Sequence, residues 1–142
     1  MRVPTTIIAV LLCLLGLALS TAASSSETSA EEIRIVVRES RDPQPRAIPL
    51  KFKLDTAKWE DGYLHIWGQI NNPTDHDYDF VEVLFVAIDR GRKVLGRTEA
   101  YCDPQTLTRG TMGYVTDETI DTQGHEPAVL EYRVIGFQAS RH

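Results

Sequence analysis

The chain has 142 residues, a formal net charge of −5, and a composition of 42% hydrophobic and 25% charged residues. This balance is typical of a globular protein, and the length allows one domain core of ordinary size and not two. The acidic charge and the lack of any run of Lys and Arg exclude a nucleic-acid backbone or an anionic membrane surface as partner, because both require clustered cations.

The N-terminal segment has the pattern of a secretory signal. Residues 3–23 are apolar and uncharged, follow Arg2, and end in small residues at Ala22 and Ala23. This pattern predicts a signal peptide over residues 1–23, so that the mature chain begins near Ser24 in a secreted or periplasmic protein. The alternative is a membrane anchor formed by residues 3–23, because the stretch borders on the roughly 17–20 apolar residues that cross a bilayer. The membrane is then a partner only through this segment.

Residues 24–46 are predicted to be a flexible leader and linker that contain one short strand. Residues 24–32 are small, polar and acidic, as in flexible leaders. Ile33, Ile35 and Val37 alternate with charged residues, which predicts a short strand within residues 32–39. Prolines and charges then mark a linker at 40–46.

The segment 47–138 alternates apolar and polar residues with the period of two that is typical of β-strands. Asp61 and Gly62 mark a turn, and residues 89–92 have the composition of a tight hairpin. The predicted strands cover residues 48–59, 63–70, 80–88, 93–101, 111–120 and 127–137. Together with the N-terminal strand they predict an all-β domain, an immunoglobulin-like antiparallel β-sandwich of about seven short strands.

The order of strand ends and loop residues in this segment resembles the FxLYD domain, a small immunoglobulin-like module of bacterial and archaeal extracytoplasmic proteins. The resemblance covers roughly residues 60–136 and is carried by Asn71-Asn72, Phe85 to Asp89, Gly91, Val94-Leu95-Gly96, Ala100-Tyr101, Asp103-Pro104, Leu107 and Gly110. Ala87 and Ile88 stand where Leu and Tyr are usual in the name-giving motif, and Arg109 stands where Pro is usual. The resemblance implies a sandwich outside the cytoplasm and no established catalytic residues.

The densest polar cluster offers the only metal candidates, Asp75, Asp77 and Asp79. Alternating carboxylates suit Ca²⁺, but the helix-loop calcium template needs Gly at its sixth position and Glu at its twelfth. Phe80 and Val86 occupy these positions. The segment is therefore expected to be a solvated loop.

No pattern of residues indicates catalysis. The histidines are scattered without ligand spacing, and no Gly-x-Ser-x-Gly motif is present. We therefore expect a chain that is not an enzyme and that needs no cofactor.

Two of the predicted strands carry large apolar residues on the face that should point away from the core. Trp67 lies opposite the apolar face of strand 63–70, and Leu84, Val86 and Ile88 lie opposite Phe85 and its neighbours in strand 80–88. Trp67, Leu84, Val86 and Ile88 therefore form a candidate partner-binding patch. Three explanations remain open, namely cover by the strand at 33–37, by a partner, or by a ligand.

Cys102 is the only cysteine that remains once Cys13 leaves with the signal peptide. We expect it to be buried and unreactive, as most free cysteines are. The alternative places it in the loop opened by Asp103-Pro104, where it could form an interchain disulfide.

These observations favour a non-catalytic secreted or envelope-associated domain for binding or scaffolding, whose partner is another envelope or extracellular protein. The alternative is a metal-binding or accessory module of an envelope enzyme system that uses the Asp75–Asp79 loop. The sequence does not identify the ligand.

Overall fold

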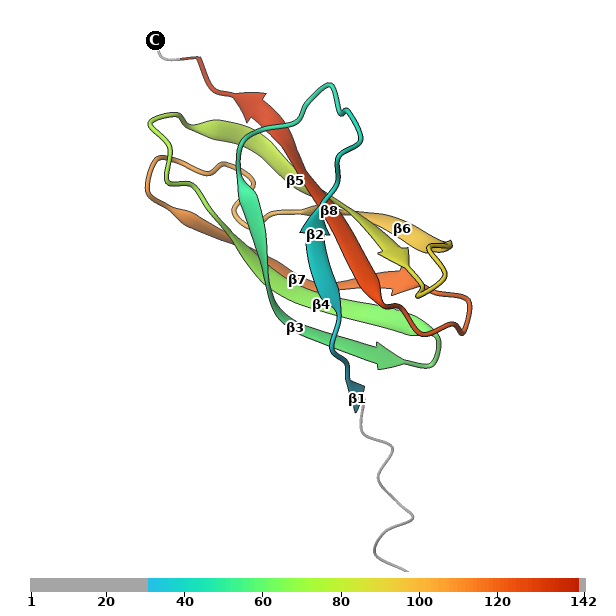
Figure 1. Ribbon diagram of the computed structural model, residues 1–142. Helices are drawn as coiled ribbons and strands as arrows, with labels where there is room; N and C mark the ends of the chain where they lie inside the picture. The colour runs from blue at the N-terminus through green and yellow to red at the C-terminus, as the bar shows by residue number, and fades with distance from the viewer. Residues whose placement is uncertain (1–30, 141–142) are drawn as a thin grey trace, which may run out of the picture.

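The computed structural model describes residues 31–140, which form a sandwich of two four-stranded sheets (Figure 1). Sheet A has the strand order β1-β3-β4-β7, and sheet B has the order β2-β8-β5-β6. The strands are β1 (Glu31–Glu32), β2 (Val36–Glu39), β3 (Lys51–Glu60), β4 (Tyr63–Asn71), β5 (Tyr78–Ile88), β6 (Val94–Tyr101), β7 (Met112–Asp121) and β8 (Val129–Gln138). The predicted all-β sandwich is confirmed.

Short turns decide which strands become neighbours in a sheet. Asp61 and Gly62 join β3 to β4 with φ angles of 52° and 82°, the left-handed conformation that a two-residue hairpin requires. At the β5–β6 hairpin the carboxylate of Asp89 accepts a hydrogen bond from the backbone N–H of Lys93 at 2.8 Å. The longer connections after β4, β6 and β7 each cross from one sheet to the other.

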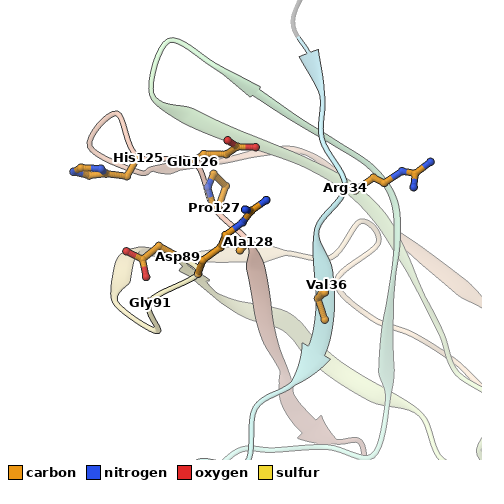
Figure 2. A pocket seen from close by; sticks show the side chains of 9 residues that line it. Arg34, Val36, Asp89, Gly91, His125, Glu126, Pro127 and Ala128 are labelled. Atoms are coloured by element: carbon orange, nitrogen blue, oxygen red, sulfur yellow. The ribbon is translucent and has the colours of Figure 1, made fainter.

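The N-terminal segment belongs to the sandwich and contributes to both sheets. β1 pairs antiparallel with β3 in sheet A, whereas β2 pairs parallel with β8 in sheet B. Figure 2 shows Val36 at the start of β2, where its backbone N–H donates to the carbonyl of Ala128 at 3.0 Å. Residues 33–35 lead the chain from sheet A to sheet B, and Ile33, Ile35 and Val37 pack against the core.

This arrangement corrects the prediction for the N-terminal strand. The single strand predicted within residues 32–39 is two strands in different sheets, and both belong to the sandwich although they precede residue 47. Residues 31–46 are therefore not merely a leader and linker. The signal peptide predicted over residues 1–23 lies outside the described residues, and residues 31–140 contain no helix long and apolar enough to cross a membrane.

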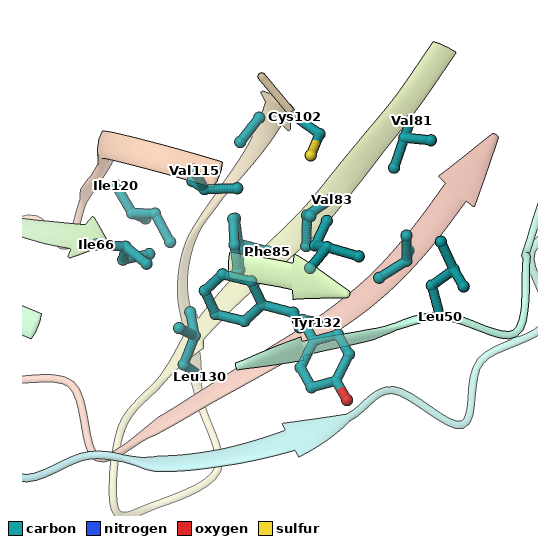
Figure 3. Packing of buried hydrophobic residues seen from close by; sticks show 14 of the residues in the cluster. Leu50, Ile66, Val81, Val83, Phe85, Cys102, Val115, Ile120, Leu130 and Tyr132 are labelled. Carbon is teal, nitrogen blue, oxygen red and sulfur yellow. The ribbon is translucent and has the colours of Figure 1, made fainter. Parts of the chain in front are cut away.

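The core lies between the sheets and is formed by every second residue of the long strands (Figure 3). Phe85 of β5 lies near its centre, 1% exposed. Its ring meets that of Phe52 edge to face, with centroids 4.9 Å apart, and Phe52 meets Tyr132 in the same manner at 5.7 Å. This geometry is the preferred one for aromatic pairs, and it joins the two sheets across the sandwich.

A buried asparagine organises the connection between β4 and β5. The amide nitrogen of Asn72 donates to the carbonyls of His76 at 2.8 Å and Leu107 at 3.0 Å. Its amide oxygen accepts from the backbone N–H of Thr74 at 3.1 Å and from the Thr74 hydroxyl at 2.6 Å. Asn72 is 0% exposed, so these bonds replace solvent for a wholly buried polar group.

Candidate functional site

The outer face of sheet B carries apolar residues between two rows of charges. Leu84 and Val86 of β5 point away from the core and are partly exposed. Leu84 is paired with Glu99 on β6 and Arg133 on β8, whereas Val86 is paired with Arg97 on β6 and Glu131 on β8. The signs of charge therefore alternate both along each flanking strand and across the sheet.

A groove of about 300 Å³ runs over Leu84 and Val86. One wall is formed by residues 97–99 of β6, and the other includes Ser40, Asp42 and Gln44, from the segment that follows β2. This segment is anchored on the β8 side, because the backbone N–H of Ser40 donates to the carbonyl of Tyr132 at 2.8 Å. The predicted linker thus shapes the face rather than only connecting strands.

The charges on the β8 side of the groove already have partners. Arg38 of β2 forms an ion pair with Glu131 at 2.6 Å, and Arg133 forms one with Glu39 at 3.0 Å. Arg97 and Glu99 on the β6 side are exposed, and neither forms an ion pair with another residue of the described chain. The β6 side therefore presents both signs of charge to solvent.

An aromatic cluster, Phe80, Phe137 and Arg46, lies at one end of this sheet. Phe80 is 59% exposed and Phe137 is 49% exposed, and their rings meet edge to face with centroids 6.3 Å apart. The guanidinium of Arg46 lies 4.2 Å from the centroid of Phe137. Two large rings and an arginine are thus held together at the surface.

The backbone at Phe80 is strained. β5 shifts register between Asp79 and Glu82, which marks a β-bulge, and Phe80 there has a φ of 52°. A bulky residue in the left-handed region is a genuine outlier, and such strain persists where the surrounding structure imposes it, often at binding sites. Bulges of this kind are common next to functional sites.

The four residues predicted as a patch do not lie together. Trp67 belongs to β4 of sheet A, on the other side of the sandwich from Leu84 and Val86, where its ring stacks with that of His65 at 6.1 Å. Ile88 is buried, with 7% exposed. Only Leu84 and Val86 of the predicted set remain on the candidate face. The aromatic cluster was not predicted, because Phe80, Phe137 and Arg46 lie far apart in the sequence and only the fold brings them together.

The first of the three explanations for the apolar outer face, cover by the strand at 33–37, does not hold. β2 extends sheet B at its edge beside β8 and does not lie over Leu84 and Val86. Part of the cover comes instead from Ser40, Asp42 and Gln44, which leave the groove open.

Carboxylates of the acidic segment 75–79 form hydrogen bonds with another loop of the domain. The carboxylate of Asp77 accepts a hydrogen bond from the backbone N–H of Arg109 at 2.9 Å, and that of Asp79 accepts one from the hydroxyl of Thr106 at 3.0 Å. Two of the three predicted metal candidates, Asp77 and Asp79, thus contact the loop between β6 and β7. Within residues 31–140, no three His, Cys, Asp or Glu side chains are placed to hold a metal ion.

A hollow of about 570 Å³ lies at one end of the sandwich between residues 89–91, residues 125–128 and the N-terminal segment (Figure 2). Arg34 and His125 point away from each other, and the lining mixes acidic and basic groups. Because these groups do not converge on one point, the hollow offers less for a ligand than the face of sheet B does.

Cys102 is buried, as predicted, and is 1% exposed directly after β6. A Cβ at Gly113 would lie 2.2 Å from its Sγ, so only glycine leaves room for the thiol there. Burial raises the pKa of the Cys102 thiol to about 11, and the neighbouring Asp103 carboxylate adds to the rise. The thiolate, which is the nucleophilic form, is therefore scarce near neutral pH.

We expect Cys102 to react slowly with a thiol reagent at neutral pH and rapidly after unfolding, as followed by mass spectrometry. An exposed thiol introduced by Thr116→Cys in a Cys102→Ala chain is the control and should react at once. Rapid labelling of native Cys102, or a dimer band lost on reduction, would contradict its burial and inertness.

Comparison of the chain with family models, curated proteins and solved structures finds no match.

Proposed function

We propose that this chain is a non-catalytic binding domain that works outside the cytoplasm and engages a protein partner through the outer face of sheet B. The aromatic cluster Phe80, Phe137 and Arg46 is its anchor. The FxLYD-like order of residues between 60 and 136 and the apolar run at 3–23 support the family and the compartment. The single observation that carries the binding role is the exposure of Phe80 at a strained bulge.

The chemistry of the cluster fits a protein partner. Aromatic residues and arginine are enriched at the centres of protein interfaces, where a few side chains supply most of the binding free energy. The Nε of Arg46 is buried and has no hydrogen-bond partner among the described residues. Packing a partner against the exposed rings would remove apolar surface from water without a large rearrangement of the domain.

The test combines removal of the rings with cross-linking from the same face. A photoreactive phenylalanine analogue replaces Tyr101, which is 62% exposed at the end of β6. The double variant Phe80→Asn, Phe137→Ser removes both rings, and asparagine tolerates the left-handed φ at position 80. We expect heteromeric cross-linked products in the native compartment to fall about tenfold or more, because a single hot spot contributes that much.

The matched control is the double variant Tyr63→Ser, Tyr114→Ser on the outer face of sheet A, where these rings are 46% and 50% exposed. It should retain the cross-linked products. Equal loss or equal retention in the two double variants, with thermal stability unchanged, would refute the anchor.

A further inference from the structure

We propose that a second copy of this chain docks face to face on the outer face of sheet B, about a twofold axis that runs along the strands. The proposal rests on the proposed function in taking this face to be a binding surface, and it assigns the centre of the face, around Leu84 and Val86, to a second copy. The occupant is favoured by the arrangement of charge around Leu84 and Val86.

The four charged residues around the apolar centre form a two-by-two pattern of alternating sign. On the β6 side Glu99 is followed by Arg97, and on the β8 side Arg133 is followed by Glu131 at the same two levels. The set is neutral, although the chain carries −5. In the correct orientation, a second copy places an opposite charge over each charge of this set. A copy of the same chain is therefore an electrostatically complementary partner.

Symmetry selects the orientation. A homodimer places the same patch on both sides of its twofold axis. An axis in the face and along the strands exchanges the β6 side with the β8 side, so that Glu99 faces Arg133 of the second copy and Arg97 faces Glu131. An axis along the diagonal of the pattern would instead bring like charges together.

An axis across the strands also brings opposite charges together, but the shape of the face disfavours it. The wall that contains Ser40, Asp42 and Gln44 is anchored on the β8 side. An axis across the strands would place this wall of one copy and the same wall of the other copy on the same side of the interface. The axis along the strands places each wall over the open β6 side of the other copy, where Arg97 and Glu99 have no ion pair within the described chain.

The expected interface is small. β5 and β6 are paired over residues 82–88, which at ~3.4 Å per residue gives a face about 24 Å long and, at ~4.8 Å between strands, about 14 Å wide. Two such faces amount to roughly 670 Å² together, below the roughly 1,200 Å² of stable specific interfaces and in the range of transient contacts. We therefore expect weak, reversible association that appears at high protein concentration and weakens with added salt.

The test is sedimentation velocity over a concentration series, with charge-reversal variants. Glu99→Arg places two cations face to face and should weaken self-association about tenfold or more. Leu84→Glu should do the same, because it places an additional charge in the apolar centre of the interface. Glu60→Arg on the outer face of sheet A makes the same change in net charge and should leave association unchanged.

Two further variants test the orientation. Mixing Glu99→Arg with Arg133→Glu should restore a heterodimer, because each reversed charge then meets its opposite. If Arg133→Glu fails to fold, the double variant Arg97→Glu, Glu99→Arg serves instead. It keeps the net charge and should abolish association about the proposed axis, whereas an axis across the strands would preserve it.

A native chain that stays monomeric at all concentrations, or Glu99→Arg that behaves like Glu60→Arg, would overturn the proposal. Retention of association by the double variant at Arg97 and Glu99 would overturn the axis. Failure here is distinguishable from failure of the proposed function, because heteromeric cross-linking that depends on Phe80 and Phe137 does not require self-association.

Discussion

Replacing Phe85 by alanine is expected to lower the free energy of unfolding by about 3–5 kcal/mol, measured by urea denaturation. Phe85 is the largest of the fully buried side chains, and its ring contacts that of Phe52 across the sandwich. Alanine removes the apolar area, the edge-to-face contact and the atoms that fill the space between the sheets. The surrounding strands are fixed by their hydrogen bonds and can close this cavity only in part.

The control is Val86→Ala on the same strand. Val86 has the opposite side-chain direction and is partly exposed, so its truncation should cost about 1 kcal/mol or less. A cost below about 1 kcal/mol for Phe85→Ala would mean that the two faces of β5 are assigned the wrong way round.

Asn72→Ala is expected to destabilise the domain by about 2–3 kcal/mol, measured by the same denaturation experiment. The substitution removes the hydrogen bonds to the carbonyls of His76 and Leu107 and leaves the backbone N–H of Thr74 without its acceptor. These groups are too enclosed for water to replace every bond, and a buried polar group without a partner is costly.

Asn71→Ala provides the matched control, because Asn71 is the exposed neighbour in sequence and should change stability by no more than about 0.5 kcal/mol. Asn72→Asp keeps the acceptor for Thr74 but loses both donors, and should also destabilise. Equal, small effects at positions 71 and 72 would show that the connection between β4 and β5 does not depend on Asn72.

Most of the strands from β3 to β8 could be predicted because they alternate with a period of two and end at recognisable turns, and β5 could be predicted as an apolar run between turns. β4, predicted at 63–70, covers Tyr63–Asn71. The division of the N-terminal segment could not be predicted in this way. Residues 33–37 alternate as a single strand would, and no Gly or Pro marks the point where the chain leaves sheet A for sheet B. Their sheet membership depends on pairing with distant residues, which local pattern does not report.

The candidate face could be predicted only in part for the same reason. The apolar outer side of β5 was visible in the sequence, so Leu84 and Val86 were found. Trp67 was grouped with them because alternation tells which side of its own sheet a residue occupies, and not which sheet that is. Phe80 has the same side-chain phase as Leu84 and Val86, but its cluster with Phe137 and Arg46 could not be predicted, because only the fold brings these distant residues together.

The parallel pairing of β2 with β8 sets the order in which the domain can be completed during synthesis. Arg38 and Glu131 form their ion pair across 93 positions of the chain. β2 leaves the ribosome before most of the domain, yet its partner strand is the last to be made, and that strand lies in the interior of sheet B between β2 and β5. Sheet B therefore cannot close until the chain is nearly complete, and such long-range pairing makes folding slow. β2 emerges early and is nevertheless among the last strands to find its neighbour.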